Sequence, residues 1–209
     1  MSGIISDNLS KSSGLIKSAG GGGGAWTLLS TETASGSATI NFTTLSSDYK
    51  DFMMVGSGIT AATNISFGRV RYYVSGSVVT ASDYQWSARA FDIQNTGGQS
   101  MDGGNKNDST IQMSDPYDGG GAVGLGNTSG YNMNFEYTVS DVHSTSLWKP
   151  SWFWNTIVQG GASPSQGVVA NYFGGGLYDQ TSALTGLRFY LSAGNIALGT
   201  VSLYGRKIS

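Results

Sequence analysis

The sequence predicts an all-β protein: an antiparallel, jelly-roll-like β-sandwich with an extended N-terminal anchor segment. Apolar and polar residues alternate with a period of two in many short stretches from Trp26 onward, as in strands with one buried face. Clusters of Gly, Ser, Asn and Asp separate these stretches and favour tight turns. Because no stretch combines 3.6-residue spacing with helix caps, we expect no long helix.

Taken along the chain, the alternation predicts nine or ten strands, at residues 26–32, 37–43, 50–57, 68–74, 83–91, 131–139, 151–158, 167–173, 187–192 and 199–207. The clearest five have well-defined inward residues, namely Val70, Tyr72 and Val74; Tyr84, Trp86, Ala88 and Ala90; Tyr131, Met133, Phe135, Tyr137 and Val139; Leu187, Phe189 and Leu191; and Val201 and Leu203. Many short strands at this spacing are typical of a sandwich and not of a parallel α/β fold.

Residues 94–130 break the pattern, because they are rich in Gly, Asn and Asp with only a short apolar stretch at 111–113. We interpret them as one or two long loops at one end of the sandwich, and such loops often carry function. Asp102 and Asp108 lie here, together with the candidate ligand-binding residues Asp115, Tyr117 and Asp118. The aspartates suit either a loop calcium site or ordinary turns, and their spacing does not match the EF-hand pattern.

Three segments divide the chain: an anchor at 1–17, a glycine-rich hinge at 18–25, and a β-sandwich head at 26–209. The five consecutive glycines at 20–24 favour a hinge, because glycine loses the most backbone freedom on ordering. The anchor has too few apolar residues to fold alone, so we expect it to dock on neighbouring subunits or other proteins, with its own head as the alternative. Its docking residues would be Ile4, Ile5, Leu9, Leu15 and Ile16.

Composition excludes several classes of protein. The chain has no cysteine, a formal charge of −2 and only 11% charged residues, so we expect no disulfide frame, no thiol chemistry and no nucleic-acid surface. No apolar run approaches the length of a membrane span, and no signal peptide is visible at the N-terminus. A composition with few charges and many small polar residues favours either assembly with other subunits or a fold of tightly packed strands and turns.

Catalytic chemistry is sparse, so we expect a protein that is not an enzyme and needs no cofactor. The single histidine, His143, has Asp141 nearby but no nucleophile motif, so a turn position is the simpler interpretation. Glutamates occur only at Glu32 and Glu136, whereas glycoside cleavage needs two carboxylates across the bond.

The aromatic stretch at 148–154 places Trp152 and Trp154 on one strand face and Phe153 on the other. Covered sandwich core is the first interpretation for these tryptophans, because tryptophan is favoured at cores and interfaces. A subunit interface and a sugar-stacking platform are the alternatives.

The chain opens with MSGIISDNLSKSSGLIK, followed after a short spacer by the stretch at 26–57, and it ends with LRFYLSAGNIALGTVSLYGRK, which contains a strand, an SGN-type turn and a final strand. These parts of the chain resemble small structural proteins of tailed bacteriophages. The resemblance implies a non-enzymatic virion component, such as a fibre, a spike or a capsid decoration protein. It further implies trimers of β-sandwich heads fixed by their N-termini to other virion proteins, and assembly in the host cytoplasm. A module that binds host surface glycan through the 94–130 loops is the alternative.

Overall fold

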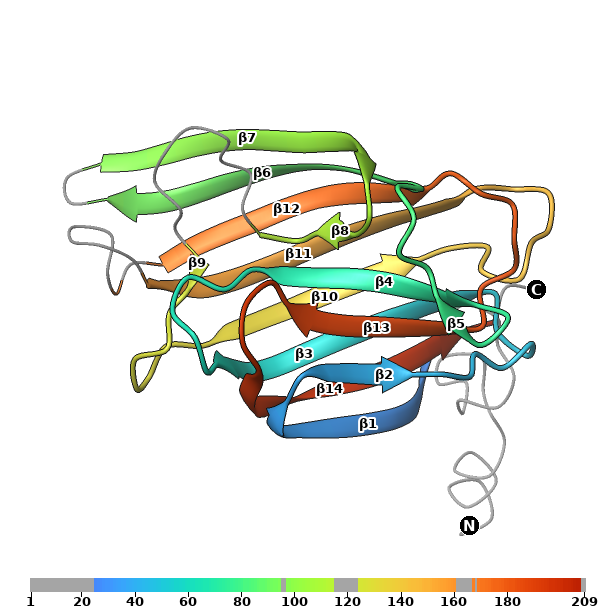
Figure 1. Ribbon diagram of the computed structural model, residues 1–209, viewed down its shortest axis with the longest axis horizontal. Helices are drawn as coiled ribbons and strands as arrows, with labels where there is room; N and C mark the ends of the chain where they lie inside the picture. The colour runs from blue at the N-terminus through green and yellow to red at the C-terminus, as the bar shows by residue number, and fades with distance from the viewer. Residues whose placement is uncertain (1–24, 95–96, 115–123, 161–166, 168, 208–209) are drawn as a thin grey trace, which may run out of the picture.

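The computed structural model describes residues 25–94, 97–114, 124–160, 167 and 169–207 (Figure 1). Across these residues the regular structure is entirely β, arranged in two antiparallel sheets, and the prediction of an all-β antiparallel sandwich is confirmed. No helix long and apolar enough to cross a membrane occurs in this part of the chain. The predicted anchor residues Ile4, Ile5, Leu9, Leu15 and Ile16 lie outside the described residues, as do Asp115, Tyr117 and Asp118.

The larger sheet has nine strands in the order β1-β14-β3-β10-β11-β12-β6-β7, with β9 paired to β11. Its strands are β1 (Trp26–Ser37), β3 (Asp51–Ala61), β6 (Tyr84–Gln94), β7 (Gly97–Asp108), β9 (Gly124–Leu125), β10 (Met133–Val139), β11 (Lys149–Gly160), β12 (Val169–Tyr178) and β14 (Ile196–Arg206). β10 and β11 lie near the middle of this sheet, and β1 and β7 form its edges.

The smaller sheet has five strands in the order β2-β13-β4-β5, with β8 paired to β4. Its strands are β2 (Thr39–Phe42), β4 (Gly68–Val74), β5 (Ser77–Val78), β8 (Ile111–Gln112) and β13 (Gly186–Leu191). Figure 1 shows β2, β13 and β4 in front of β14, β3 and β10. The ring of Phe135 on β10 stacks on Phe189 of β13 with centroids 4.6 Å apart, so the two sheets pack directly on each other.

Buried tyrosines join the two sheets. Tyr72 on β4 and Tyr137 on β10 hydrogen-bond through their hydroxyl groups. The Tyr84 hydroxyl on β6 accepts the Tyr72 backbone N–H at 3.0 Å, and all three side chains are fully buried. Because a buried hydroxyl must find a partner, these contacts fix how the sheets sit on each other.

The inward faces predicted from alternation agree with the structure at the strand centres. Met133, Phe135, Tyr137 and Val139 are buried, and Glu136 and Asn134 between them are not. Gly56 on β3 faces Phe135 so closely that an added Cβ would lie 2.0 Å from the ring. Glycine here lets the aromatic core reach the backbone of the neighbouring strand.

The prediction of loops over 94–130 is wrong for residues 97–108, which form the edge strand β7. β7 pairs with β6 along its length, with Asp108 opposite Tyr84 at one end and Gly97 opposite Gln94 at the other. Two side-chain contacts support it, namely the Arg89–Asp102 ion pair and the Trp86 Nε1 hydrogen bond to Asp108 at 2.8 Å. The stretch has almost no apolar alternation. An edge strand does not need one, because backbone pairing and polar contacts alone can hold it.

Candidate functional site: an aromatic face with a glycine groove

Large aromatic side chains are exposed on the outward face of the larger sheet. Trp152 and Trp154 on β11 are 48% and 51% exposed, Phe173 on β12 is 43% exposed, and Phe91 on β6 is 46% exposed. We call these four residues the aromatic face. Exposed aromatic side chains gathered on one surface mark binding surfaces more often than isolated ones do.

Strand register brings these four side chains together. Trp154 pairs with Phe173, and Phe173 pairs with Arg89 on the next strand. The rings of Phe91 and Phe173 stack, with centroids 5.6 Å apart and planes at 24°. The aromatic face therefore spans three adjacent strands, β11, β12 and β6. Neighbouring strands lie about 4.8 Å apart.

The interpretation of Trp152 and Trp154 as covered core is wrong in this structure. β11 buries every second residue, so Phe153 is 1% exposed while its two neighbours point away from the smaller sheet. The alternation itself is correct, but the face that is buried carries Lys149, Ser151, Asn155 and Gln159, so residue type alone does not tell which face of this strand is covered.

Beside the aromatic face lies a groove with a floor of small residues. Gly175 on β12 sits between Trp152 and Ser87, and Ser87 pairs with Gly104 on β7. We call the row Gly175, Ser87 and Gly104 the glycine groove. A Cβ added to Gly175 would meet only one atom, the Ser151 carbonyl oxygen at 3.1 Å, so the space above it is open.

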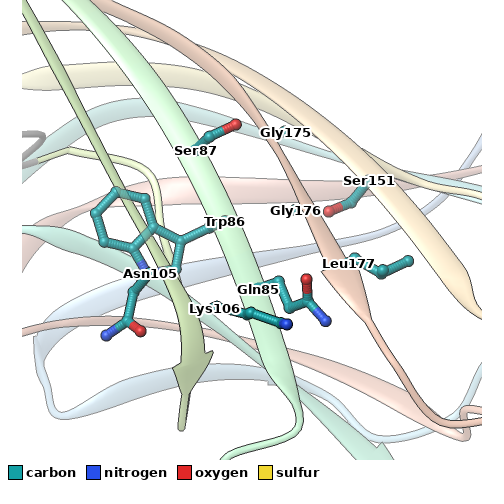
Figure 2. A pocket seen from close by; sticks show the side chains of 9 residues that line it. All are labelled: Gln85, Trp86, Ser87, Asn105, Lys106, Ser151, Gly175, Gly176 and Leu177. Atoms are coloured by element: carbon teal, nitrogen blue, oxygen red, sulfur yellow. The ribbon is translucent and has the colours of Figure 1, made fainter.

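Two hollows of about 420 and 380 Å³ adjoin at Ser87. Figure 2 shows the residues of the larger one on β7, β6 and β12, where Gly175 carries no side chain. Phe173 and Arg89 border the smaller hollow. The groove therefore runs across the strands, along the side of the aromatic face.

Polar groups border both sides of the groove. The Arg89 guanidinium donates to both Asp102 carboxylate oxygens at 2.5 and 2.8 Å, and these bonds and its charge lower the pKa of Asp102. On the other side, Gln85 donates to Asp179 at 3.1 Å, and Lys106 is exposed. The groove thus offers donors and acceptors next to apolar rings.

His143 lies in the turn after β10, half-buried. Its Nε2 is 3.1 Å from the Ser46 carbonyl oxygen, and its ring packs edge-on against Phe52. The Asp141 carboxylate instead pairs with Lys50 at 2.8 Å. Asp141 is therefore engaged elsewhere and does not orient the imidazole as a triad would require.

Glu32 and Glu136 lie on β1 and β10, and β14 and β3 separate these strands. Three strand spacings put the two backbones about 14 Å apart. The two carboxyl groups of a glycosidase lie about 5–9.5 Å apart, so the strand spacing does not bring these glutamates together as such a pair.

Asp102 and Asp108, which the structure places on β7, are not arranged as a metal site. Asp102 binds Arg89, and Asp108 accepts hydrogen bonds from Trp86 and from the Ser109 backbone. Among the described residues no group of three or more His, Cys, Asp or Glu side chains could hold an ion.

Sequence reasoning identified the tryptophans but missed Phe91, Phe173 and the groove. The feature that could have located Phe173 on the outward face is its position two residues before Gly175, because residues two apart in a strand share a face. The groove depends on pairing Gly175 with Ser87 and Ser87 with Gly104, which are far apart in sequence. Strand register, and not local pattern, creates this site.

No protein-family model, curated protein or solved structure matches the chain.

Proposed function

We propose that the chain is a non-enzymatic structural component of a tailed-phage particle. Its β-sandwich head is displayed on the virion surface as a fibre, spike or decoration protein, as a trimer, and residues 1–17 attach it to other virion proteins. The observation that carries this proposal is the resemblance at the two ends of the chain. The sandwich, whose β1 begins at Trp26, two residues after the last glycine of the run at 20–24, is compatible with such a head.

The anchor is tested by deleting residues 2–17 and following incorporation into particles. The shortened protein should keep its far-ultraviolet circular dichroism and its unfolding midpoint, and should be absent from purified particles. A second variant keeps the full length of the chain and changes only Ile4, Ile5, Leu9, Leu15 and Ile16 to serine. It should also be absent from purified particles. Normal incorporation of either variant contradicts the anchor assignment.

A second function, glycan binding, is favoured by the aromatic face. The C–H face of a sugar ring packs on an aromatic ring, and its hydroxyl groups need donors and acceptors beside that ring. Trp152, Trp154 and Phe173 supply the rings, and Gln85 and the Arg89–Asp102 pair supply the polar groups. We therefore propose the glycan site on the outward face of the larger sheet, while Asp115, Tyr117 and Asp118 lie outside the described residues.

The groove separates this function from a flat subunit contact. Interface cores are closely packed and poor in charged residues. Here open hollows lie beside an exposed ion pair whose partners, Arg89 and Asp102, are 49% and 63% exposed. Such a surface suits a narrow polar polymer, such as a glycan, better than the flat sheet of a second subunit.

Glycan binding is tested by affinity electrophoresis in gels that contain polysaccharides from candidate host bacteria. Trp154→Ala should weaken binding about tenfold, because an aromatic contact contributes about 1.4 kcal/mol. Gly175→Thr should weaken it as strongly by filling the groove, while leaving the inward face intact. Leu198→Ala, an exposed apolar residue on β14, is the matched control and should bind normally.

The outcomes separate the two functions. Binding lost in the Trp154 and Gly175 variants supports the glycan site, whereas binding unchanged in both refutes it. If Trp154→Ala instead changes the native mass in solution, the aromatic face is a contact between copies. None of these results decides the anchor, which the deletion tests separately.

A further inference from the structure

A second surface, on the opposite side of the sandwich, gathers arginines over tyrosines. Arg69, Arg71 and Tyr73 follow one face of β4, and Arg188 and Tyr190 follow the same face of β13. These residues alternate with the buried Val70, Tyr72, Leu187 and Phe189. They therefore point away from the larger sheet, and we call these five residues the arginine face.

Like charges stand directly opposite each other on this face. Arg71 pairs in register with Arg188, and Arg69 pairs with Tyr190. Directly opposed like charges destabilise a sheet. The described residues supply no carboxylate to offset this cost, because the ion pairs within them involve Lys50, Arg89 and Arg206.

Stacking and neutral hydrogen bonds hold the arginines in place. Arg71 lies over the Tyr190 ring at 5.2 Å, and Arg188 lies over the Tyr73 ring at 5.4 Å. Arg188 also donates to Asn41 and to the Tyr73 hydroxyl at 2.8 and 2.9 Å. A guanidinium fixed by stacking loses little freedom when it binds a further group.

Donors remain free on these guanidinium groups. Arg71 donates from Nε and Nη2 to Ser109, and Arg69 donates from Nη2 to Gln112, while each guanidinium carries five N–H donors. Both side chains are partly exposed. The face therefore presents fixed positive charge with unused donors in a protein whose formal charge is −2.

We propose that the arginine face binds an acidic polysaccharide through its carboxylate groups. A guanidinium fork binds a carboxylate with two parallel hydrogen bonds, and Arg71 and Arg188 on neighbouring strands could each take one carboxylate of a repeating chain. Nucleic acid fits less well, because guanidinium groups already cover the tyrosine rings that bases would need for stacking. This site is independent of the aromatic face and has a different ligand chemistry.

The test measures binding of the full-length protein to polygalacturonate by titration calorimetry at low and at physiological salt. Arg71→Gln should weaken binding about tenfold, as expected for one lost charge-assisted contact, and should reduce the salt dependence. Lys50→Gln is the control, because Lys50 is an exposed cation that belongs to neither the arginine face nor the aromatic face. It should bind as the unmodified protein does.

Two further probes define the ligand. Dextran carries no charge and should not bind through the arginine face. Poly-glutamate tests whether an acidic polypeptide, instead of an acidic polysaccharide, is the ligand. The proposal is overturned if polygalacturonate does not bind, if Arg71→Gln binds normally, or if Lys50→Gln weakens binding equally. It is also overturned if poly-glutamate binds more tightly than polygalacturonate. Equal denaturation midpoints of the two variants show that both remain folded.

Discussion

At the residue scale, Lys149 is the most unusual charged residue of the core. It is fully buried at the start of β11, on the inward face with Ser151 and Phe153. Its Nζ donates to the carbonyl oxygens of Ser144, Leu147 and Thr181 at 2.8, 2.5 and 3.4 Å. Burial lowers its pKa. One ammonium group thus ties the turn before β11 to the turn after β12.

Replacing Lys149 with methionine should lower the free energy of unfolding by about 2–4 kcal/mol, because buried carbonyl groups lose their donor. Urea unfolding followed by circular dichroism measures this change. Lys106→Met, at an exposed position on β7, should change it by less than about 0.5 kcal/mol. A Lys149 variant as stable as the Lys106 variant would show that the ammonium group does not hold the turns.

The buried tyrosines predict a loss of stability at high pH. Burial raises the pKa of Tyr72 to about 12, and burial also raises the pKa of Tyr84 and of Tyr137. The unfolded chain binds these protons less tightly, with pKa values near 10. The stabilisation is therefore complete below about pH 10 and is lost as the pH rises through about 12, and Tyr72 alone contributes about 3 kcal/mol.

Urea unfolding at a series of pH values between about 8 and 12 measures this dependence. The free energy of unfolding should fall above about pH 10, and phenolate absorbance of the buried tyrosines should appear only with unfolding. Tyr72→Phe removes one titrating group and should flatten the decline. A stability that stays constant up to pH 12 would contradict the buried cluster.

At the element scale, β7 and β10 differ most in how they are held. β10 is paired on both sides, with β3 and β11, and its inward residues are fully buried. β7 is paired on one side only, with β6. Local opening requires less free energy where fewer backbone and apolar contacts must be broken.

Hydrogen exchange followed by mass spectrometry should therefore show faster exchange in β7 than in β10. Asp102→Asn removes the carboxylate that pairs with Arg89 and should increase exchange in β7 while leaving β10 unchanged. Equal protection of the two strands in the unmodified protein would mean that β7 is covered by another chain, as in an oligomer.

The same contrast explains how much of the fold could be predicted from the sequence. The alternation in β10 identified the strand and its buried face, because one face of that strand is apolar and the other polar. β7 has no such alternation, since its pairing depends on Arg89, Trp86 and backbone hydrogen bonds from β6. On β11 the buried face carries the polar residues Lys149, Ser151 and Asn155 while the tryptophans lie on the exposed face, so the pattern located the strand but placed the tryptophans in the core.

At the scale of the whole molecule, the sandwich presents two chemically different outer faces. The larger sheet carries exposed rings and the glycine groove, and the smaller sheet carries arginines stacked on tyrosines. Neither face could be assembled from the sequence, because each depends on side chains from strands far apart in the chain. Between them lies a continuous apolar core, which leaves both outer faces free to carry function.

The central claim is that the aromatic face of the larger sheet is a binding surface for a glycan. Radical footprinting of the full-length protein tests it directly, by measuring oxidation of Trp152 and Trp154 with and without a host surface polysaccharide. We predict rapid oxidation of both in the free protein and strong protection by the polysaccharide, with Trp26 on β1 unchanged. Protection already present without polysaccharide, or no protection while the polysaccharide is bound, would contradict the claim.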